Sequence, residues 1–135
     1  MFTIITDSCA DLNPSFVDAQ QDFQVLPLTF TIEGKTYPDA PDGGMDSKTF
    51  NDLLRSGVVA TTSQVNVNDV YDAILPLLKE GKEVLYVVFS SGLSGTYQSA
   101  EIARKMLEEE VPGARVFMVD SLCASAGQGL LVTHA

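Results

Sequence analysis

The sequence predicts an α/β fold with a three-layer α/β/α arrangement, in which helices cover both faces of a mostly parallel sheet. A small β-ribbon is predicted in addition. Strand-like apolar runs alternate with helix-like patterns along the whole chain. One run, residues 84–89, is continuously apolar, which is typical of a parallel strand buried on both faces. With 135 residues, 45% of them hydrophobic, the chain has the size of one globular domain over residues 1–135.

The first half of the chain is predicted to form two strands, a ribbon and two helices. Asn13 and Pro14 indicate a helix start, because Asn caps the first turn and proline fits its first position. Pro38 ends the ribbon, and segment 39–46 has the Pro, Gly and Asp residues of a surface loop. The predicted elements are a strand at 2–6, a helix from Pro14, a strand at 23–32 that turns at Glu33 and Gly34 into the ribbon, and a helix from Ser47 to Gly57.

The second half continues the alternation after a polar loop at residues 61–64. Apolar residues at helical spacing predict a helix over 67–78, which Pro76 should kink. The following helix is expected to bury Met106 and to pair Glu101 with Lys105 on its solvent side. The other predicted elements are a strand at 84–89, a helix that includes 97–107, a strand at 115–119 and a helix that runs to residue 135.

The charge balance excludes several classes of partner. A formal net charge of -10 repels nucleic-acid phosphates and the surface of an anionic membrane. No apolar run approaches the roughly 20 residues that span a bilayer, and Asp7 lies where a signal peptide needs a basic region. Cys9 and Cys123 lack the spacing of a zinc or redox site and fit reduced thiols. We therefore expect a cytoplasmic protein without a stable membrane anchor.

Polar residues follow three of the predicted strands: Asp7-Ser8, Ser90-Ser91 and Asp120-Ser121. Because the carboxyl ends of parallel strands meet at one edge of a sheet, these residues predict a shared polar crevice. The alternative is that each pair only caps a helix. Segment 90–96, SSGLSGT, has more hydroxyls and glycines than a cap needs, and its N–H groups at a helix start favour an anion such as a carboxylate or a phosphate.

The turn at 90–96 does not match a catalytic loop. Thr96 occupies the place of the second glycine in GxSxG, and the single histidine, His134, lies at the end of the chain. The spacings of a P-loop and of a dinucleotide-binding loop are not met either. One histidine and no CxxC leave only scattered carboxylates as metal ligands. The sequence therefore predicts an anion-binding protein with no metal, no cofactor and no catalysis of its own.

The chain resembles the DegV family of bacterial fatty-acid-binding proteins. The resemblance covers the whole chain and rests on four motifs in order: TDSCADL, TTSQ, SSGLSGTYQSA and VDSLCASAGQG. It implies a carrier that binds a long-chain fatty acid and presents the carboxylate to a separate fatty-acid kinase, which forms an acyl-phosphate for phospholipid synthesis. It also implies that the hydroxyls of Thr62 and Ser91 hold the carboxylate. Further contacts are expected from Ser63, Ser90, Gly92, Ser94, Asp7, Ser8 and Ser121.

Members of this family resemble two-domain proteins of about twice this length. The resemblance therefore implies that this chain is an N-terminal domain, and that a second half completes the acyl tunnel. The face between the two halves is then exposed here, and a dimer through that face is a further expectation. The alternative is an enzyme that acts on a phosphorylated or acyl substrate, with its catalytic groups in the missing half.

Overall fold

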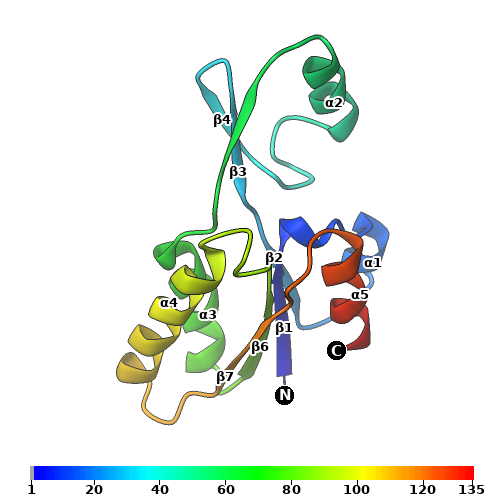
Figure 1. Ribbon diagram of the computed structural model, residues 1–135. Coiled ribbons are helices and arrows are strands. Elements are labelled where there is room, and N and C mark those ends of the chain that lie inside the picture. The colour runs from blue at the N-terminus through cyan, green and yellow to red at the C-terminus, as the bar shows by residue number, and fades with distance from the viewer. Residues whose placement is uncertain (1) are drawn as a thin grey trace.

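The computed structural model describes residues 2–135, which form a four-stranded parallel sheet between two layers of helices (Figure 1). Helices α3 and α4 cover one face of the sheet, and α1 and α5 lie on the other (Figure 1). The strands are β1 (Phe2–Asp7), β2 (Phe23–Leu26), β6 (Glu83–Val88) and β7 (Val116–Asp120), in the order β2-β1-β6-β7. The helices are η1 (Ser8–Ala10), α1 (Pro14–Asp18), α3 (Val67–Lys79), α4 (Thr96–Glu110) and α5 (Ala126–His134). The predicted α/β/α class is confirmed.

The main core lies between β6 and the layer of α3 and α4. Val84, Tyr86 and Val88 alternate along β6 and are buried, because every second side chain of a strand points to the same face. They pack with Ile74 of α3 and Leu107 of α4 in one cluster. The continuous apolar run of this strand is therefore explained by burial on both faces, as the sequence predicts.

A small antiparallel sheet lies beyond the carboxyl ends of the parallel strands, at the top of Figure 1. It consists of β3 (Thr29–Ile32), β4 (Lys35–Pro38) and β5 (Ala60–Ser63), and the chain between β4 and β5 forms α2 (Ser47–Arg55). We call residues 29–63 the small lobe. The Phe30 ring stacks on Tyr37 at 5.4 Å and meets Phe50 of α2 edge-on at 4.9 Å between ring centroids. These aromatic contacts join the helix to the sheet.

Two predictions in this region are wrong. Residues 23–32 are not one strand, because the chain leaves the parallel sheet at Pro27 and enters the antiparallel sheet at Thr29. Proline has no N–H to donate to a ladder, so it marks the break. Residues 61–64 are not simply a polar loop either, since Thr61 to Ser63 belong to β5 and pair with β3. These threonines pair with residues some 30 positions away in the chain, so the local sequence pattern does not predict the strand.

The details of α4 also differ from expectation. Met106 is 42% exposed, although it was expected to face the core. Glu101 pairs with Arg104 at 3.2 Å rather than with Lys105, and Arg104 also reaches Glu108 at 2.6 Å. Positions three and four apart both adjoin on a helix, and the guanidinium fork of arginine can serve two carboxylates at once.

Close packing of α5 against η1 provides a test of the fold. An added Cβ at Gly129 would lie 2.7 Å from the carbonyl oxygen of Ala10, whereas at Gly127 it would lie 3.2 Å from the nearest atom, in the side chain of Cys123. We expect Gly129→Ala to lower the free energy of unfolding by about 1–3 kcal/mol, because backbone must move. Gly127→Ala is the matched control. Alanine is about 1 kcal/mol more favourable than glycine in a helix, so this variant should be as stable as the wild type or more stable. Urea unfolding followed by circular dichroism measures both, and equal effects would contradict this packing.

Candidate ligand-binding cleft

A cleft with a volume of about 460 Å³ separates the small lobe from the carboxyl ends of the parallel strands. The small lobe contributes Phe30, Phe50 and Thr62 to its lining, and the loops after the strands contribute Ser8, Phe89 and Ser125. This lining combines aromatic surface with a few hydroxyl groups, which is the usual composition of a site for a small ligand. The position also agrees with the rule that open α/β sheets bind ligands at the carboxyl ends of their strands.

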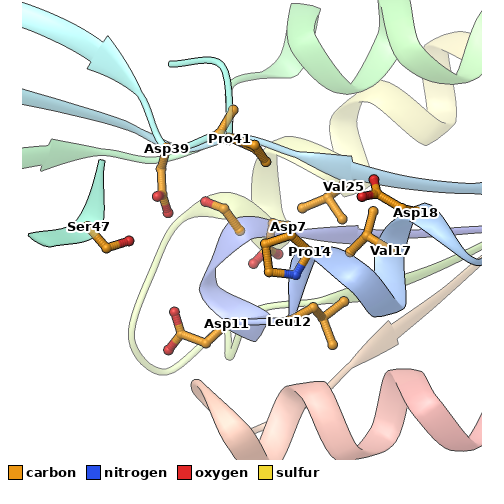
Figure 2. Close-up of a pocket in the computed structure, with 12 residues that line it drawn as sticks. Asp7, Asp11, Leu12, Pro14, Val17, Asp18, Val25, Asp39, Pro41 and Ser47 are labelled. Carbon is orange, nitrogen blue, oxygen red and sulfur yellow. The ribbon is translucent and has the colours of Figure 1, made fainter. Parts of the chain in front are cut away.

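A second hollow, of about 380 Å³, adjoins the cleft and shares Ser8, Asp11, Asp39 and Ser47 with it. Figure 2 shows the carboxylates of Asp11 and Asp39 on one side of this hollow and the apolar side chains of Val17 and Val25, with Asp18, on the other. Carboxylates repel an anion. A ligand with an anionic head is therefore better placed with its head at the Thr62 side of the cleft.

The turn after β6 has two well-fixed serines and one exposed serine. The buried Ser90 donates its N–H to the carbonyl of Cys123 at 3.2 Å and accepts from the N–H of Gly92 at 3.2 Å. The hydroxyl of Ser94 accepts from the N–H of Thr96 at 3.2 Å, although the N-cap residue of α4 is Gly95 and has no side-chain cap. Of the three pairs, the capping alternative describes Asp7, which caps η1 through the N–H of Cys9. Ser91 is exposed, as are Gly92 and Leu93 at the tip of the turn.

Asp120 holds this tip in place from the neighbouring strand. Its Oδ1 accepts from the N–H of Ser91 at 3.1 Å and from the N–H of Leu122 at 3.2 Å. A hydrogen bond from the Ser91 side chain, assisted by the backbone N–H groups of Ser91 and Leu122, lowers the pKa of Asp120 below its usual value of 3.8. An ionised Asp120 thus fixes the backbone from which the Ser91 side chain projects.

Gln64 connects the segment of Thr62 to the turn that carries Ser91. Its Nε2 donates to the hydroxyl of Ser99, in the first turn of α4, at 3.1 Å. A side chain at Gly95 would collide with the amide of Gln64, so the glycine leaves the space that this contact needs. This hydrogen bond therefore joins the TTSQ motif to the SSGLSGTYQSA motif, which contains Ser99 and lies far away in the sequence.

Asp7 is fully buried and binds three N–H groups. Its Oδ2 accepts from the backbone of Phe89 at 2.9 Å, and its Oδ1 accepts from the backbone of Cys9 at 3.2 Å and from Nε2 of Gln128 at 3.1 Å. Burial raises the pKa of Asp7 above its usual value of 3.8, and the hydrogen bonds counteract this only in part. Asp7 thus joins the ends of β1 and β6 to α5.

The structure separates the predicted site residues into two groups. Thr62 and Ser8 line the cleft. Ser63, Ser91 and Gly92 are exposed and are not among the described residues that line it. The hydroxyls of Ser8 and Ser121 bind backbone groups, since Ser8 accepts from Leu28 N–H at 3.1 Å and Ser121 from Cys123 N–H at 3.2 Å. The sequence did not single out Gln64 or Gln128 as site residues. The one signal for them was their place inside two of the four motifs.

Nucleophilic and metal chemistry find little support at the cleft. Burial, together with the charges of Asp7, Asp39 and Asp11, raises the pKa of the Cys9 thiol to about 12, so it is not a thiolate at neutral pH. Over residues 2–135, no three His, Cys, Asp or Glu side chains gather in a way that could hold a metal ion. In the same residues, every helix is too short or too polar to cross a bilayer.

The family model described as "Uncharacterised protein, DegV family" matches residues 1–135, the entire chain. The chain belongs to the DegV family. A DegV domain-containing protein of Lactococcus lactis, YteA, is 40% identical over 131 residues, which are 97% of this chain and 45% of that protein. A DegV domain-containing protein of Clostridium perfringens is 43% identical over 134 residues, 99% of this chain and 46% of that protein. The chain thus spans about half the length of these DegV relatives.

Solved structures have the same DegV fold. A stearic acid-binding protein from Eubacterium ventriosum superposes with a TM-score of 0.89 at 23% identity, over 98% of this chain and 45% of that one. A DegV family protein from Thermus thermophilus, whose structure is described as fatty acid binding, gives a TM-score of 0.81 at 34% identity, over 98% and 45% of the two chains. A protein from Thermotoga maritima, described as revealing fatty acid binding function, gives 0.77 at 33% identity, over 96% and 45%.

Proposed function

We propose that this DegV protein binds a long-chain fatty acid and presents the carboxylate to a fatty-acid kinase, which forms the acyl-phosphate used in phospholipid synthesis. The observation that carries the proposal is the cleft between the small lobe and the sheet, in which Thr62 lies beside the aromatic rings of Phe30 and Phe50. Apolar walls suit an acyl chain, and a hydroxyl at one end suits its carboxylate. The fatty-acid binding described for the relatives from Thermus thermophilus and Thermotoga maritima supports the same ligand class.

In this proposal, the hydroxyls of Thr62 and Ser91 hold the carboxylate from the two segments that Gln64 joins. Two hydroxyls bind the oxygens without placing a full positive charge beside them, so the oxygens stay reactive toward a phosphoryl donor. Ser91 is exposed at the tip of its turn, where a second protein has access to it. The protein itself acts as a carrier in the cytoplasm and not as a catalyst.

The proposal includes a second domain, because the chain spans 45% of the relative from Lactococcus lactis. Apolar side chains are exposed on the parallel strands: Phe2 at 50%, and Phe117 and Val119 at 42% each. Phe2 and Phe117 lie 6.0 Å apart between ring centroids. A second domain would cover this surface in a longer protein. In this chain alone the same surface favours a dimer, which sedimentation equilibrium measures and a monomer at all concentrations would contradict.

Fatty-acid binding is tested directly with the purified full-length protein, which includes the second domain proposed above. We expect mass spectrometry of an organic extract to detect a co-purified long-chain fatty acid, and calorimetric titration of delipidated protein with oleate to show saturable binding. Incubation with ATP and oleate, without any partner, should give no acyl-phosphate. Absence of both the co-purified lipid and the titration signal would refute the carrier proposal, and turnover without a partner would favour the enzyme alternative.

A further inference from the structure

We propose that Gln128 is a positioning residue for the carboxylate site: through Asp7, it holds the backbone that leads into Ser91. This inference rests on the proposed function. Gln128 lies on α5, on the far side of the sheet from α3 and α4 (Figure 1). Its side chain is fully buried. No catalytic or ligand contact is assigned to it. Its effect is transmitted through other side chains.

The amide of Gln128 meets three oxygens at the carboxyl ends of two strands. Its Nε2 lies 3.1 Å from Oγ1 of Thr6, 3.1 Å from Oδ1 of Asp7 and 3.4 Å from the carbonyl oxygen of Val87. Thr6 in turn donates its hydroxyl to the same carbonyl at 2.9 Å. One donor group from α5 therefore connects the last residues of β1 and β6. The turn that carries Ser91 begins directly after β6.

Asp7 carries this connection to the candidate site. While its Oδ1 is held by Gln128, its Oδ2 accepts the N–H of Phe89 at 2.9 Å. Phe89 lines the cleft, and Ser91 follows two residues later. The start of the turn is thus fixed by Asp7, and its tip is fixed by Asp120. Release of Asp7 would remove the bond that fixes the start of the turn and leave it held by Asp120 and by the N–H of Ser90 on the Cys123 carbonyl.

The unpaired half of the Gln128 amide also indicates a role beyond packing. Within residues 2–135, its Oε1 is buried and has no hydrogen-bond partner. A buried acceptor without a partner destabilises a fold, and an apolar side chain of the same length would avoid that cost. The glutamine is therefore not the best residue for stability at this position. Unlike an apolar residue, Gln128 supplies an N–H donor to the carboxylate of Asp7.

The test is Gln128→Met, which keeps the length of the side chain and removes both the donor and the unpaired oxygen. We expect oleate to bind about tenfold more weakly by calorimetry, the effect of about one lost hydrogen bond, with the midpoint of thermal unfolding unchanged or higher. Gln98→Met is the matched control, because Gln98 is an exposed glutamine on α4, and it should change neither quantity.

A double-mutant cycle separates positioning from a general structural effect. If Gln128 acts through the turn, Gln128→Met should weaken oleate binding less than twofold further in a Ser91→Ala background, since the group that it positions is then absent. Full additivity of the two losses would overturn the inference. So would unchanged oleate affinity in Gln128→Met while the wild type binds.

Two further outcomes are decisive. If the wild type itself does not bind oleate, the proposed function is refuted, and this inference falls with it. If Gln128→Met does not fold, Gln128→Leu gives a second apolar variant without the donor. Failure of both variants to fold would overturn the inference, because the side chain would then serve the fold and not the site.

Discussion

Replacement of Asp7 by alanine is expected to lower the free energy of unfolding by about 3 kcal/mol or more. The substitution leaves the part-buried N–H groups of Phe89 and Cys9 without their acceptor and removes one of the three acceptors of the buried Gln128 amide. Each buried donor without a partner costs about 1–3 kcal/mol. Urea unfolding followed by circular dichroism measures the change. Asp18→Ala is the control, because Asp7 and the exposed Asp18 both line the hollow of about 380 Å³ drawn in Figure 2. This control should change the free energy of unfolding by less than about 0.5 kcal/mol.

The pH dependence of this variant follows from the raised pKa of Asp7. The folded protein holds the Asp7 proton more tightly than the unfolded chain, because burial disfavours the charged carboxylate. The contribution of Asp7 to stability is therefore complete below its usual pKa of 3.8 and decreases as the pH rises through its folded pKa. We expect the difference in unfolding free energy between wild type and Asp7→Ala to narrow with rising pH. A difference that widens over this range would mean that the carboxylate is stabilised in the fold.

Removal of the Thr62 or the Ser91 hydroxyl is expected to weaken fatty-acid binding strongly. A hydrogen bond to a charged carboxylate contributes about 1.5–3 kcal/mol, so each of Thr62→Ala and Ser91→Ala should raise the dissociation constant for oleate by about 10- to 150-fold. Calorimetric titration of delipidated protein measures the change. Stability should stay nearly constant, because both side chains are exposed.

The matched control for this pair is Thr61→Ala. Thr61 precedes Thr62 on β5, and successive residues of a strand point to opposite faces, so its hydroxyl faces away from the direction of Thr62. It should bind oleate as the wild type does. Equal losses at Thr61 and Thr62 would indicate damage to the strand, and unchanged affinity at both Thr62 and Ser91 would remove these hydroxyls from the site.

The layered architecture was predictable because it depends on the spacing of apolar and capping residues within short segments of the chain. The apolar run at 84–89 and the cap at Asn13 identify a buried strand and a helix start from neighbouring residues alone, and the structure confirms both. In the small lobe, the ribbon of β3 and β4 and helix α2 were also predicted correctly, but the strand at 60–63 and its pairing with β3 were missed. There, residues 29–32 and 60–63 form strands that pair across a long connection containing α2. Pairing of this kind depends on the partner strand and not on the periodicity of either segment.

By itself, the sequence determined the α/β class, the hydroxyl-rich turn after the central strand and, through four ordered motifs, the family. These features rest on residues that are close together in the chain. Only the tertiary structure decided how the motifs meet. The Gln64 amide reaches Ser99 across 35 residues, and the Gln128 amide reaches Asp7 across 121. A buried hydrogen bond forms where folding brings a donor to an acceptor, and no spacing within either motif specifies that meeting.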